Sequence, residues 1–551
     1  MKPTTLAQLP TNSTSMEPAV ISGPRQMTDR LTLAELLADP LSSAPAIITT
    51  SPLVVVSYKA LANQIESLSG KLSKAGLKSG DCVAIVLPNS LEFLVIFLAL
   101  TRARLVAAPL NPAYKPDEIS FFIKNAGAKA VVVERISTAV MQATANLGVP
   151  VWTPLADVRG VVDLQELPRA PRTTSDAPNP NEVALLAYTS GTTGRPKCVP
   201  LTHANIVWSS RNIAAHYGLT SADRSLAVMP LFHGHGLIGS TLSTLASGGC
   251  VIVPPRFSAS AFWGQFREHR ATWYSAVPTI HQVLLARADS DGAPYSGARF
   301  IRSCSAALAP TILTRLEHRF GAAVLEAYGM TEAAHQVASN PLPPLRHRPG
   351  TVGPGEGISI IDETGTHLAT NSPGEVVVRG PNIMRGYRND PDANATAFIN
   401  GWFRTGDTGT IDRDGYLTLI GHTKELINRG GEKISPGEVE AVLLEHHAVA
   451  EVAVFGVPDA KYGEEVWAAV VLRSPADPQE LQAFCSTRVA DFKVPKLVRV
   501  ISAMPKNATG KIQRRDLAAI LKAPPRQTNP AIALAKSTTS SSPKNQITKG
   551  V

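Results

Sequence analysis

The chain has 551 residues, which is too long for one ordinary hydrophobic core and predicts roughly three or four structural units. Hydrophobic residues make up 44% of the sequence and charged residues 18%, as is typical of a well-buried globular protein. The formal net charge is +9, but four basic residues and no acidic residue lie after residue 522, so residues 1–522 carry +5. No dense run of lysine and arginine occurs in this part, which argues against nucleic-acid binding.

The cysteines and the two ends of the chain bear on the compartment. The five cysteines lie far apart and form no CxxC pair, which favours a reducing compartment and argues against structural zinc. The best candidate for a membrane span, residues 94–100, is much shorter than the roughly 18 apolar residues that a span requires. Residues 1–27 lack the apolar core of a secretion signal, and the last residues are not a Ser-Lys-Leu type peroxisomal signal. We therefore expect a cytoplasmic protein, with a peroxisomal location less favoured.

Apolar runs alternate with helical patterns along most of the chain. Residues 58–72 have helical periodicity, whereas residues 82–87 and 129–134 have the apolar and β-branched density of buried strands. Further strand-like runs lie at residues 225–230, 249–254, 272–277 and 300–303. The succession of strand, helix and strand predicts an α/β fold of layered, mostly parallel sheets. Ligands collect at the strand ends of such sheets, so we expect the site there.

The sequence pattern changes in the last third of the chain. Turns between short strands predict a β-rich subdomain at residues 352–416, and a last unit pairs strands at 451–455 and 465–471. The predicted segments are a loose leader (1–27), an N-terminal domain of layered α/β subdomains plus the β-rich subdomain (28–420), a small C-terminal α+β domain (421–522) and a disordered tail (523–551). The oligomeric state stays open.

A loop of glycines and short hydroxyl residues spans residues 187–203 and follows the apolar run 183–186. Glycine lets backbone N–H groups approach phosphate oxygens, the hydroxyls donate hydrogen bonds, and a lysine adds positive charge. The pattern differs from the common nucleoside-triphosphate loop, because its glycines are three residues apart and its lysine precedes Cys198. The predicted phosphate-binding residues are Thr189, Ser190, Gly191, Thr192, Thr193, Gly194 and Lys197.

Three more motifs follow this loop in order: YGMTE at residues 328–332, FRTGD at 403–407 and TGKI at 509–512. Together the four motifs resemble the adenylate-forming family of acyl-CoA synthetases, aryl-CoA ligases, luciferases and peptide-synthetase adenylation domains, over about residues 31–522. The resemblance implies an acid–thiol ligase that uses ATP, Mg²⁺ and coenzyme A. A carboxylate attacks the α-phosphorus of ATP, pyrophosphate leaves, and a thiol then displaces AMP.

The resemblance also implies roles for single residues. Lys511, Thr331 and Glu332 would be catalytic, Lys511 bridging the acid and the α-phosphate and Glu332 holding magnesium. The C-terminal domain would rotate about Lys424 after adenylation and bring the Gly430–Gly431 turn to the site for coenzyme A. The residues expected around AMP are Ser305, Ala306 and Ala307 with Tyr328 at the adenine, Thr331 at the α-phosphate, and Asp407 and His422 at the ribose.

Three residues depart from the family pattern. Cys198 replaces a glycine after Lys197, and His422 replaces an arginine that helps to grip the ribose. Histidine is shorter and lacks the arginine fork, so ATP affinity or the hinge equilibrium is expected to differ. Gly234 replaces a larger residue, which would widen the acid pocket.

Residues 256–260, 271–281, 300–307 and 332–341 narrow the resemblance to the branch of oxalate-CoA ligases and 4-coumarate-CoA ligase-like enzymes. Oxalate is the leading substrate, because a two-carbon diacid needs a small pocket with donors for its second carboxylate. The candidate donors are His233, His281, His335 and Ser305. Three alternatives stay open: a ligase for another small, branched or aromatic acid in a biosynthetic pathway, a catalytically impaired nucleotide-binding protein, and a module that loads a carrier protein.

Overall fold

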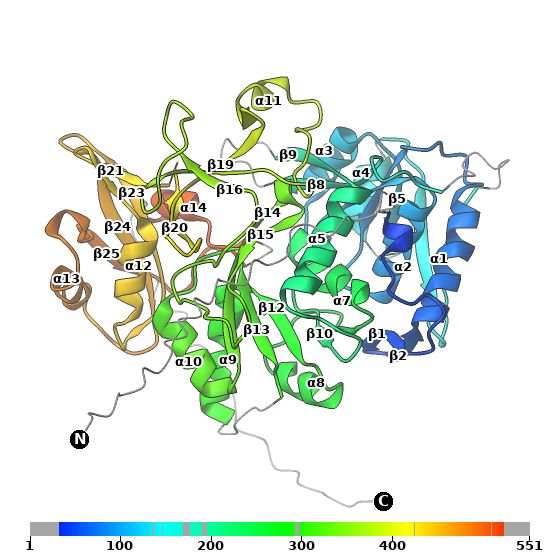
Figure 1. The fold of residues 1–551 in the computed structure, drawn as a ribbon, viewed down its shortest axis with the longest axis horizontal. Coiled ribbons are helices and arrows are strands. Elements are labelled where there is room, and N and C mark those ends of the chain that lie inside the picture. Colours follow the sequence, from blue (N-terminus) through cyan, green and yellow to red (C-terminus); the bar gives the residue numbers. More distant parts are fainter. Residues whose placement is uncertain are drawn as a thin grey trace, which may run out of the picture.

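The computed structural model describes residues 32–134, 137–145, 147–168, 177–189, 196–291, 297–423, 425–507 and 510–522 (Figure 1). The predicted leader and tail lie outside these residues. Two large mixed sheets, a β-rich sheet and a smaller C-terminal sheet with helices form the predicted layered α/β fold. Among the described residues, no helix has both the length and the apolar character needed to cross a membrane.

The first large sheet has seven strands in the order β7-β6-β5-β3-β4-β8-β9. Its inner pairs are parallel, whereas β6–β7 and β8–β9 are antiparallel. Every residue of β3 is buried, because inner parallel strands are covered on both faces. The strands are β3 (Cys82–Val86), β4 (Val106–Pro109), β5 (Ala128–Val133), β6 (Val151–Ala156), β7 (Val162–Gln165), β8 (Val183–Thr189) and β9 (Lys197–Thr202).

The second large sheet has eight strands in the order β15-β14-β13-β12-β10-β11-β1-β2, again parallel inside and antiparallel at both ends. The predicted strand 225–230 is too long, since β10 ends at Leu226 and Pro230 has no N–H for a ladder bond. The strands are β1 (Pro45–Thr50), β2 (Leu53–Ser57), β10 (Arg224–Leu226), β11 (Cys250–Val253), β12 (Trp273–Ala276), β13 (Phe300–Cys304), β14 (Ala323–Met330) and β15 (His335–Ser339).

Helix α2 (Leu91–Arg102) belongs to a hydrophobic core that also contains residues of both large sheets. The Ser90 hydroxyl caps this helix by accepting from Phe93 N at 3.1 Å, and residues 93–101 are all buried. The apolar run 94–100 is therefore a core helix. The other helices of these layers are α1 (Tyr58–Leu72), which coincides with the predicted helix, α3 (Pro116–Ala126), α4 (Thr138–Ala145), α5 (His203–His216), α6 (Gly234–Gly236), α7 (Ser243–Ala246), α8 (Phe262–Glu268), α9 (Pro278–Asp291), α10 (Pro310–Phe320), the π-helix η2 (Leu237–Leu242) and the 3₁₀ turns η1 (Leu33–Glu35) and η3 (Thr331–Ala333).

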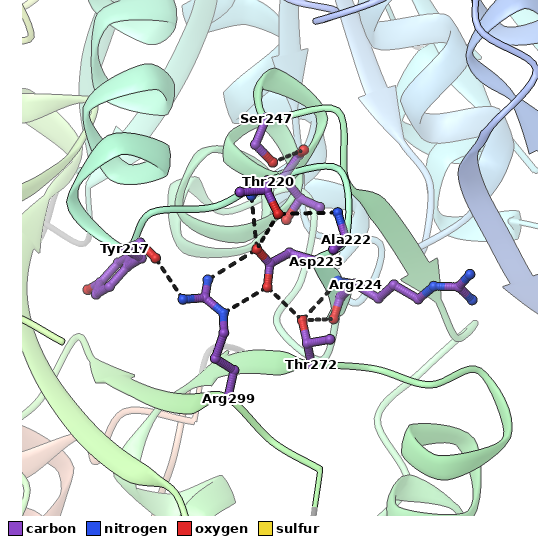
Figure 2. A network of polar contacts seen from close by, with 9 residues as sticks. Tyr217, Thr220, Ala222, Asp223, Arg224, Ser247, Thr272 and Arg299 are labelled. Carbon is purple, nitrogen blue, oxygen red and sulfur yellow. Dashed lines mark hydrogen bonds and ion pairs between the residues drawn. The ribbon is translucent and has the colours of Figure 1, made fainter. Parts of the chain in front are cut away.

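A polar cluster ties together the segments that lead into β10, β12 and β13 (Figure 2). The buried Asp223 carboxylate accepts from Arg299 Nε at 2.9 Å, from Thr272 Oγ1 at 2.9 Å and from Thr220 N at 2.9 Å. Arg299 also donates to the carbonyl oxygen of Tyr217 at 2.9 Å. The cluster satisfies a buried charge at the amino ends of these strands, which leaves their carboxyl ends for the site.

The β-rich subdomain is confirmed as a five-stranded antiparallel sheet. The C-terminal unit (yellow to red in Figure 1) has a second five-stranded sheet, in which the predicted pairing places Phe455 opposite Trp467. The elements of the first sheet are β16 (Ile358–Ile361), β17 (Gly374–Val378), β18 (Phe398–Ile399), β19 (Trp402–Ile411), β20 (Leu417–His422) and α11 (Pro391–Ala397). Those of the second are β21 (Ile427–Arg429), β22 (Glu432–Ile434), β23 (Val449–Asp459), β24 (Gly463–Leu472), β25 (Leu497–Val500), α12 (Pro436–Leu444), α13 (Pro478–Ser486), α14 (Arg514–Lys522) and η4 (Asp491–Lys493).

The hydrophobic cores divide at the start of the C-terminal unit. The largest core joins both large sheets and the β-rich sheet. From Ile427 onward, the buried apolar residues form two cores of their own, one on each face of the β23–β24 pair. The predicted domain boundary at residue 420 falls inside β20, which precedes these separate cores.

Candidate active site

The predicted phosphate loop is the turn of the β8–β9 hairpin, with Thr189 opposite Lys197 at its end. The turn η3, which carries Thr331 and Glu332, contacts both strands of this hairpin. Ser190, Gly191, Thr192, Thr193 and Gly194 lie outside the described residues, so their phosphate contacts stay predictions. Cys198 is buried in a hydrophobic core that also contains residues of β3.

A tyrosine joins the predicted phosphate lysine to the predicted metal ligand. The Tyr387 hydroxyl donates to Glu332 Oε1 at 2.8 Å, and Lys197 Nζ lies 4.5 Å from the centroid of the same ring. Burial raises the pKa of Glu332, whereas the hydrogen bond from Tyr387 and the charge of Lys197 lower it. Tyr387 had no predicted role, because its segment matches no motif of known chemistry.

The residues around Glu332 fit a magnesium ion that is shared with a nucleotide. Among the described residues, no three side chains of His, Cys, Asp or Glu gather into a metal site of their own. Magnesium in nucleotide sites is held by one or two carboxylates together with phosphate oxygens and water. A single buried carboxylate near the lysine predicted to bind phosphate matches this donor set.

The predicted adenine and ribose residues come together at the carboxyl ends of β13 and β14. Tyr328 donates a short hydrogen bond to Asp407 on β19, and Asp407 pairs with His422 across the β19–β20 ladder. Burial raises the pKa of Asp407, while the Tyr328 bond and the electrostatic effects of His422 and Lys511 lower it. Ser305 has a left-handed φ of 73°, which costs energy outside glycine and is common at functional sites. The neighbouring residues Ala306 and Ala307 are exposed, as an adenine-facing loop requires.

The loop that carries Lys511 rests on the N-terminal domain. Thr279 Oγ1, at the start of α9, donates to the Gly510 carbonyl at 3.3 Å, and Lys511 N donates to Asn507 Oδ1 at 2.9 Å. The positive charge of Lys511 acts to lower the pKa of His233 and that of Asp407, so its ammonium group lies within electrostatic range of both residues.

The structure describes the turn predicted to bind coenzyme A, but not the predicted hinge residue. Lys424 lies outside the described residues, so its role stays a prediction. Gly430 and Gly431 form the β21–β22 turn with φ values of 62° and 98°, and Gly430 N donates to the Tyr462 carbonyl at 2.8 Å. These contacts hold the turn on its own domain, and the structure does not bring it to the Lys511 site.

The three histidines predicted for the acid pocket differ in their burial and in their contacts. His335 is buried, and its ring stacks on that of His235 with 5.1 Å between centroids. His233 is half-buried and its Nδ1 accepts from the His235 backbone N–H at 3.2 Å. His281 lies behind β12 against the hydroxyl of Tyr274, with 3.2 Å from its Nδ1 to that oxygen. Burial lowers the pKa of His233 and of His281 to about 4.

A fully buried arginine contacts His335, one of the predicted acid-pocket residues. Arg302, on β13, donates to Ser275 Oγ, His335 Nε2 and Gln336 Oε1, each at 3.0 Å, and to the Tyr217 hydroxyl at 2.8 Å. These partners are all neutral groups, since burial and the arginine hold the pKa of His335 well below its usual range. The guanidinium therefore keeps a positive charge that no partner in this network cancels.

Hydrogen bonds through Ser275 and His235 connect the charged Arg302 to Ser305. His235 contacts Ser275 Oγ at 2.6 Å through Nε2 and Ser305 Oγ at 3.0 Å through Nδ1. Ser275 accepts from Arg302 and can donate its own proton to His235 Nε2; in that tautomer, His235 donates from Nδ1 to Ser305. The Ser305 proton is left to donate to a bound acid. Sequence reasoning found Ser305 and missed Arg302 and His235, although a charge inside the apolar strand 300–304 was a signal.

The chain matches the family described as AMP-binding enzyme over residues 40–388, and the description AMP-binding enzyme C-terminal domain over residues 438–511. The chain belongs to the AMP-binding enzyme family. An oxalate–CoA ligase of Arabidopsis thaliana is 47% identical over 485 residues, which cover 84% of this chain and 93% of that protein. An oxalate–CoA ligase of Saccharomyces cerevisiae is 42% identical over 80% of this chain and 86% of that protein.

Solved structures place this AMP-binding enzyme in the same fold. MatB from Rhodopseudomonas palustris, with ATP bound, superposes with a TM-score of 0.80 at 32% identity, covering 89% of this chain and 98% of that one. The family matches and the CoA ligases among its relatives confirm the predicted enzyme class, an acid–thiol ligase that uses ATP and coenzyme A.

Proposed function

We propose that this AMP-binding enzyme converts oxalate, ATP and coenzyme A into oxalyl-CoA, AMP and pyrophosphate. The observation that carries the choice of acid is the buried, uncancelled charge of Arg302 beneath Ser305, His235 and His335. Oxalate is a dianion at neutral pH. One carboxylate reacts, and the other needs a fixed positive charge and hydrogen-bond donors at short range. The similarity to oxalate–CoA ligases supports the same acid.

The polar lining disfavours the alternative acids. An aromatic or branched acid has no second carboxylate to accept from Ser305 or to offset the buried charge of Arg302, so it forgoes a stabilisation of about 1.5–3 kcal/mol. The presence of Lys511, Glu332 and Asp407 in one site argues against a nucleotide-binding protein without catalysis. A module that loads a carrier protein stays the alternative that the thioester assay below decides.

Each predicted site residue would have a different task in the reaction. Lys511 would lie beside the α-phosphate and offset the negative charge that builds as a carboxylate oxygen attacks phosphorus and the bond to pyrophosphate breaks. Thr331 would donate to the same phosphate, while Lys197 and the hairpin loop would hold the departing pyrophosphate. Magnesium, held by Glu332 and phosphate oxygens, would neutralise phosphate charge. After the domain rotates about Lys424, the thiol of coenzyme A attacks the acyl carbon beside Gly430 and Gly431, and AMP leaves.

Acid-dependent exchange of pyrophosphate into ATP tests the proposal. We expect the purified enzyme to catalyse exchange with oxalate and less with malonate, acetate, benzoate and 4-coumarate, and to form oxalyl-CoA when coenzyme A is added. Exchange with no acid would refute the catalytic assignment. Preference for an aromatic or branched acid would refute oxalate, and exchange without a CoA thioester would favour carrier loading.

Restoring the family arginine at residue 422 should tighten ATP binding. His422 on β20 lies directly opposite Asp407 on the neighbouring strand β19, so an arginine there can add a charge-assisted hydrogen bond at the ribose. One such bond of about 1 kcal/mol lowers the apparent KM for ATP by about fivefold. His422→Gln, which adds no charge, is the matched control. An unchanged or raised KM for ATP in His422→Arg contradicts this account of the departure.

The cytoplasmic location belongs to the same proposal. All five cysteines are free and buried, which is the pattern of a protein kept in a reducing compartment. Fractionation of the cells that make the protein, with cytosolic and peroxisomal markers, tests the compartment directly.

A further inference from the structure

We propose that Tyr387 is a positioning residue for adenylation, whose hydroxyl orients the magnesium ligand Glu332 and whose ring holds the phosphate lysine Lys197. This inference rests on the proposed function, because it assigns a task within the same site. It concerns nucleotide binding rather than the choice of acid, so the two proposals can fail separately.

The contacts of Tyr387 join two segments that are far apart in the sequence. Its side chain is 8% exposed, its hydroxyl donates to Glu332 Oε1 at 2.8 Å, and its ring centroid lies 4.5 Å from Lys197 Nζ. A cation over an aromatic face is attracted by the ring, more strongly when water is excluded. One side chain therefore sets the positions of a carboxylate on η3 and an ammonium group on β9.

The backbone around Tyr387 is attached to the same two segments. Met384 N donates to the Glu332 carbonyl at 2.8 Å, and Arg388 N donates to the Cys198 carbonyl, next to Lys197, at 2.9 Å. Main-chain bonds on either side of the tyrosine thus fix the distance between η3 and β9. The Tyr387 ring therefore lies between η3 and β9, two segments to which its own backbone is already bonded.

Asn394 on α11 fixes the tyrosine from the opposite side. Its Oδ1 accepts from Tyr387 N at 2.7 Å and its Nδ2 donates to the Tyr387 carbonyl at 2.8 Å. Gly386 has a φ of 146°, and a Cβ there would lie 3.0 Å from Asn394 Oδ1. These bonds leave the ring little freedom, so the positions of Glu332 and Lys197 are set before a nucleotide binds.

The arrangement also keeps two opposite charges available. A direct ion pair between Lys197 and Glu332 would occupy the groups that phosphate and magnesium need, and no such pair occurs in the described part of the chain. Tyr387 gives each group a separate, weaker partner. ATP and magnesium can then replace those partners without first breaking a salt bridge.

Two substitutions separate the tasks of the hydroxyl and the ring. Tyr387→Phe removes the bond to Glu332 and keeps the ring, so the magnesium concentration for half-maximal ATP binding should rise about tenfold, the effect of losing one hydrogen bond to a charged group. Metal-free ATP should bind as in the wild type. Tyr387→Leu removes both contacts and should weaken metal-free ATP binding as well. Tyr416→Phe, whose hydroxyl contacts the Arg346 carbonyl outside the site, is the matched control.

The dependence on magnesium is the readout that a merely structural role would not move. Calorimetric titration of ATP with and without magnesium needs no acid substrate, so it remains informative if oxalate is wrong. A Tyr387→Phe enzyme with the wild-type magnesium requirement overturns the proposal, as does a Tyr416→Phe enzyme with the same shift.

Discussion

Lys511→Ala should lower the rate of acyl-adenylate formation by about 100- to 1,000-fold, the cost of removing one preorganised group that stabilises transition-state charge. The loop that holds Lys511 packs on Thr279 at the start of α9, and its charge reaches both His233 and Asp407. These observations support the proposed role of Lys511 between the acid, the α-phosphate and the ribose. Pyrophosphate exchange into ATP measures this half-reaction alone.

The same variant should form the thioester from supplied acyl-adenylate at close to the wild-type rate. In the proposed scheme, the second half-reaction uses the C-terminal domain in its other position, with the Gly430–Gly431 turn at the site in place of the lysine. Lys511→Arg keeps the charge and should retain part of the exchange activity. Equal loss of both half-reactions in Lys511→Ala would falsify the two-position scheme.

Arg302→Met should lower kcat/KM for oxalate by about 10- to 100-fold, because it removes the buried positive charge that polarises the proposed donors to the second carboxylate, and a hydrogen bond to a charged group contributes about 1.5–3 kcal/mol. Activity with acetate, which has no second carboxylate, should fall much less. Methionine keeps most of the side-chain length without the charge, so the apolar neighbours of Arg302 remain packed. The ratio of the two kcat/KM values measures the effect on specificity.

Stability controls distinguish specificity from misfolding in Arg302→Met. The substitution leaves Ser275, Gln336 and Tyr217 without their donor, but it also removes a buried charge whose partners are all neutral, and the two effects oppose each other. We expect a thermal midpoint within a few degrees of the wild type. Arg302→Lys keeps a charge without the fork and should fall between the two. Equal losses with oxalate and acetate would show that Arg302 supports the pocket rather than the second carboxylate.

Local patterns were enough to predict much of the fold. Helix α1, the buried strands β3 and β5, and the β23–β24 pairing follow from periodicity and apolar density within short windows. The predicted strand 225–230 was too long, because a short apolar run does not show where the chain leaves a sheet. That point depends on the turn at Pro230, where the backbone packs closely against Gly236.

The site was predictable only as far as its motifs reached. YGMTE and FRTGD each lie within a few residues, and the structure joins them through Tyr328 and Asp407. Arg302, His235 and Tyr387 act through partners that are tens to hundreds of residues away in the sequence, such as Ser275, Gln336 and Lys197. No local pattern contains such pairings, so histidines were chosen by residue type. Of the three predicted histidines, His233 and His281 are linked to Arg302 less directly than His235, which was not predicted.

The separate cores of the C-terminal unit have a mechanical consequence. The apolar residues from Ile427 onward pack among themselves, so turning this unit exposes no part of the large core. What must break are peripheral contacts such as the bond between Thr279 and Gly510, which costs little and reforms readily. The two orientations can therefore be close in free energy, and the ligands present decide which one is populated. In the proposed scheme, the departure of pyrophosphate or the arrival of the thiol would reverse this balance.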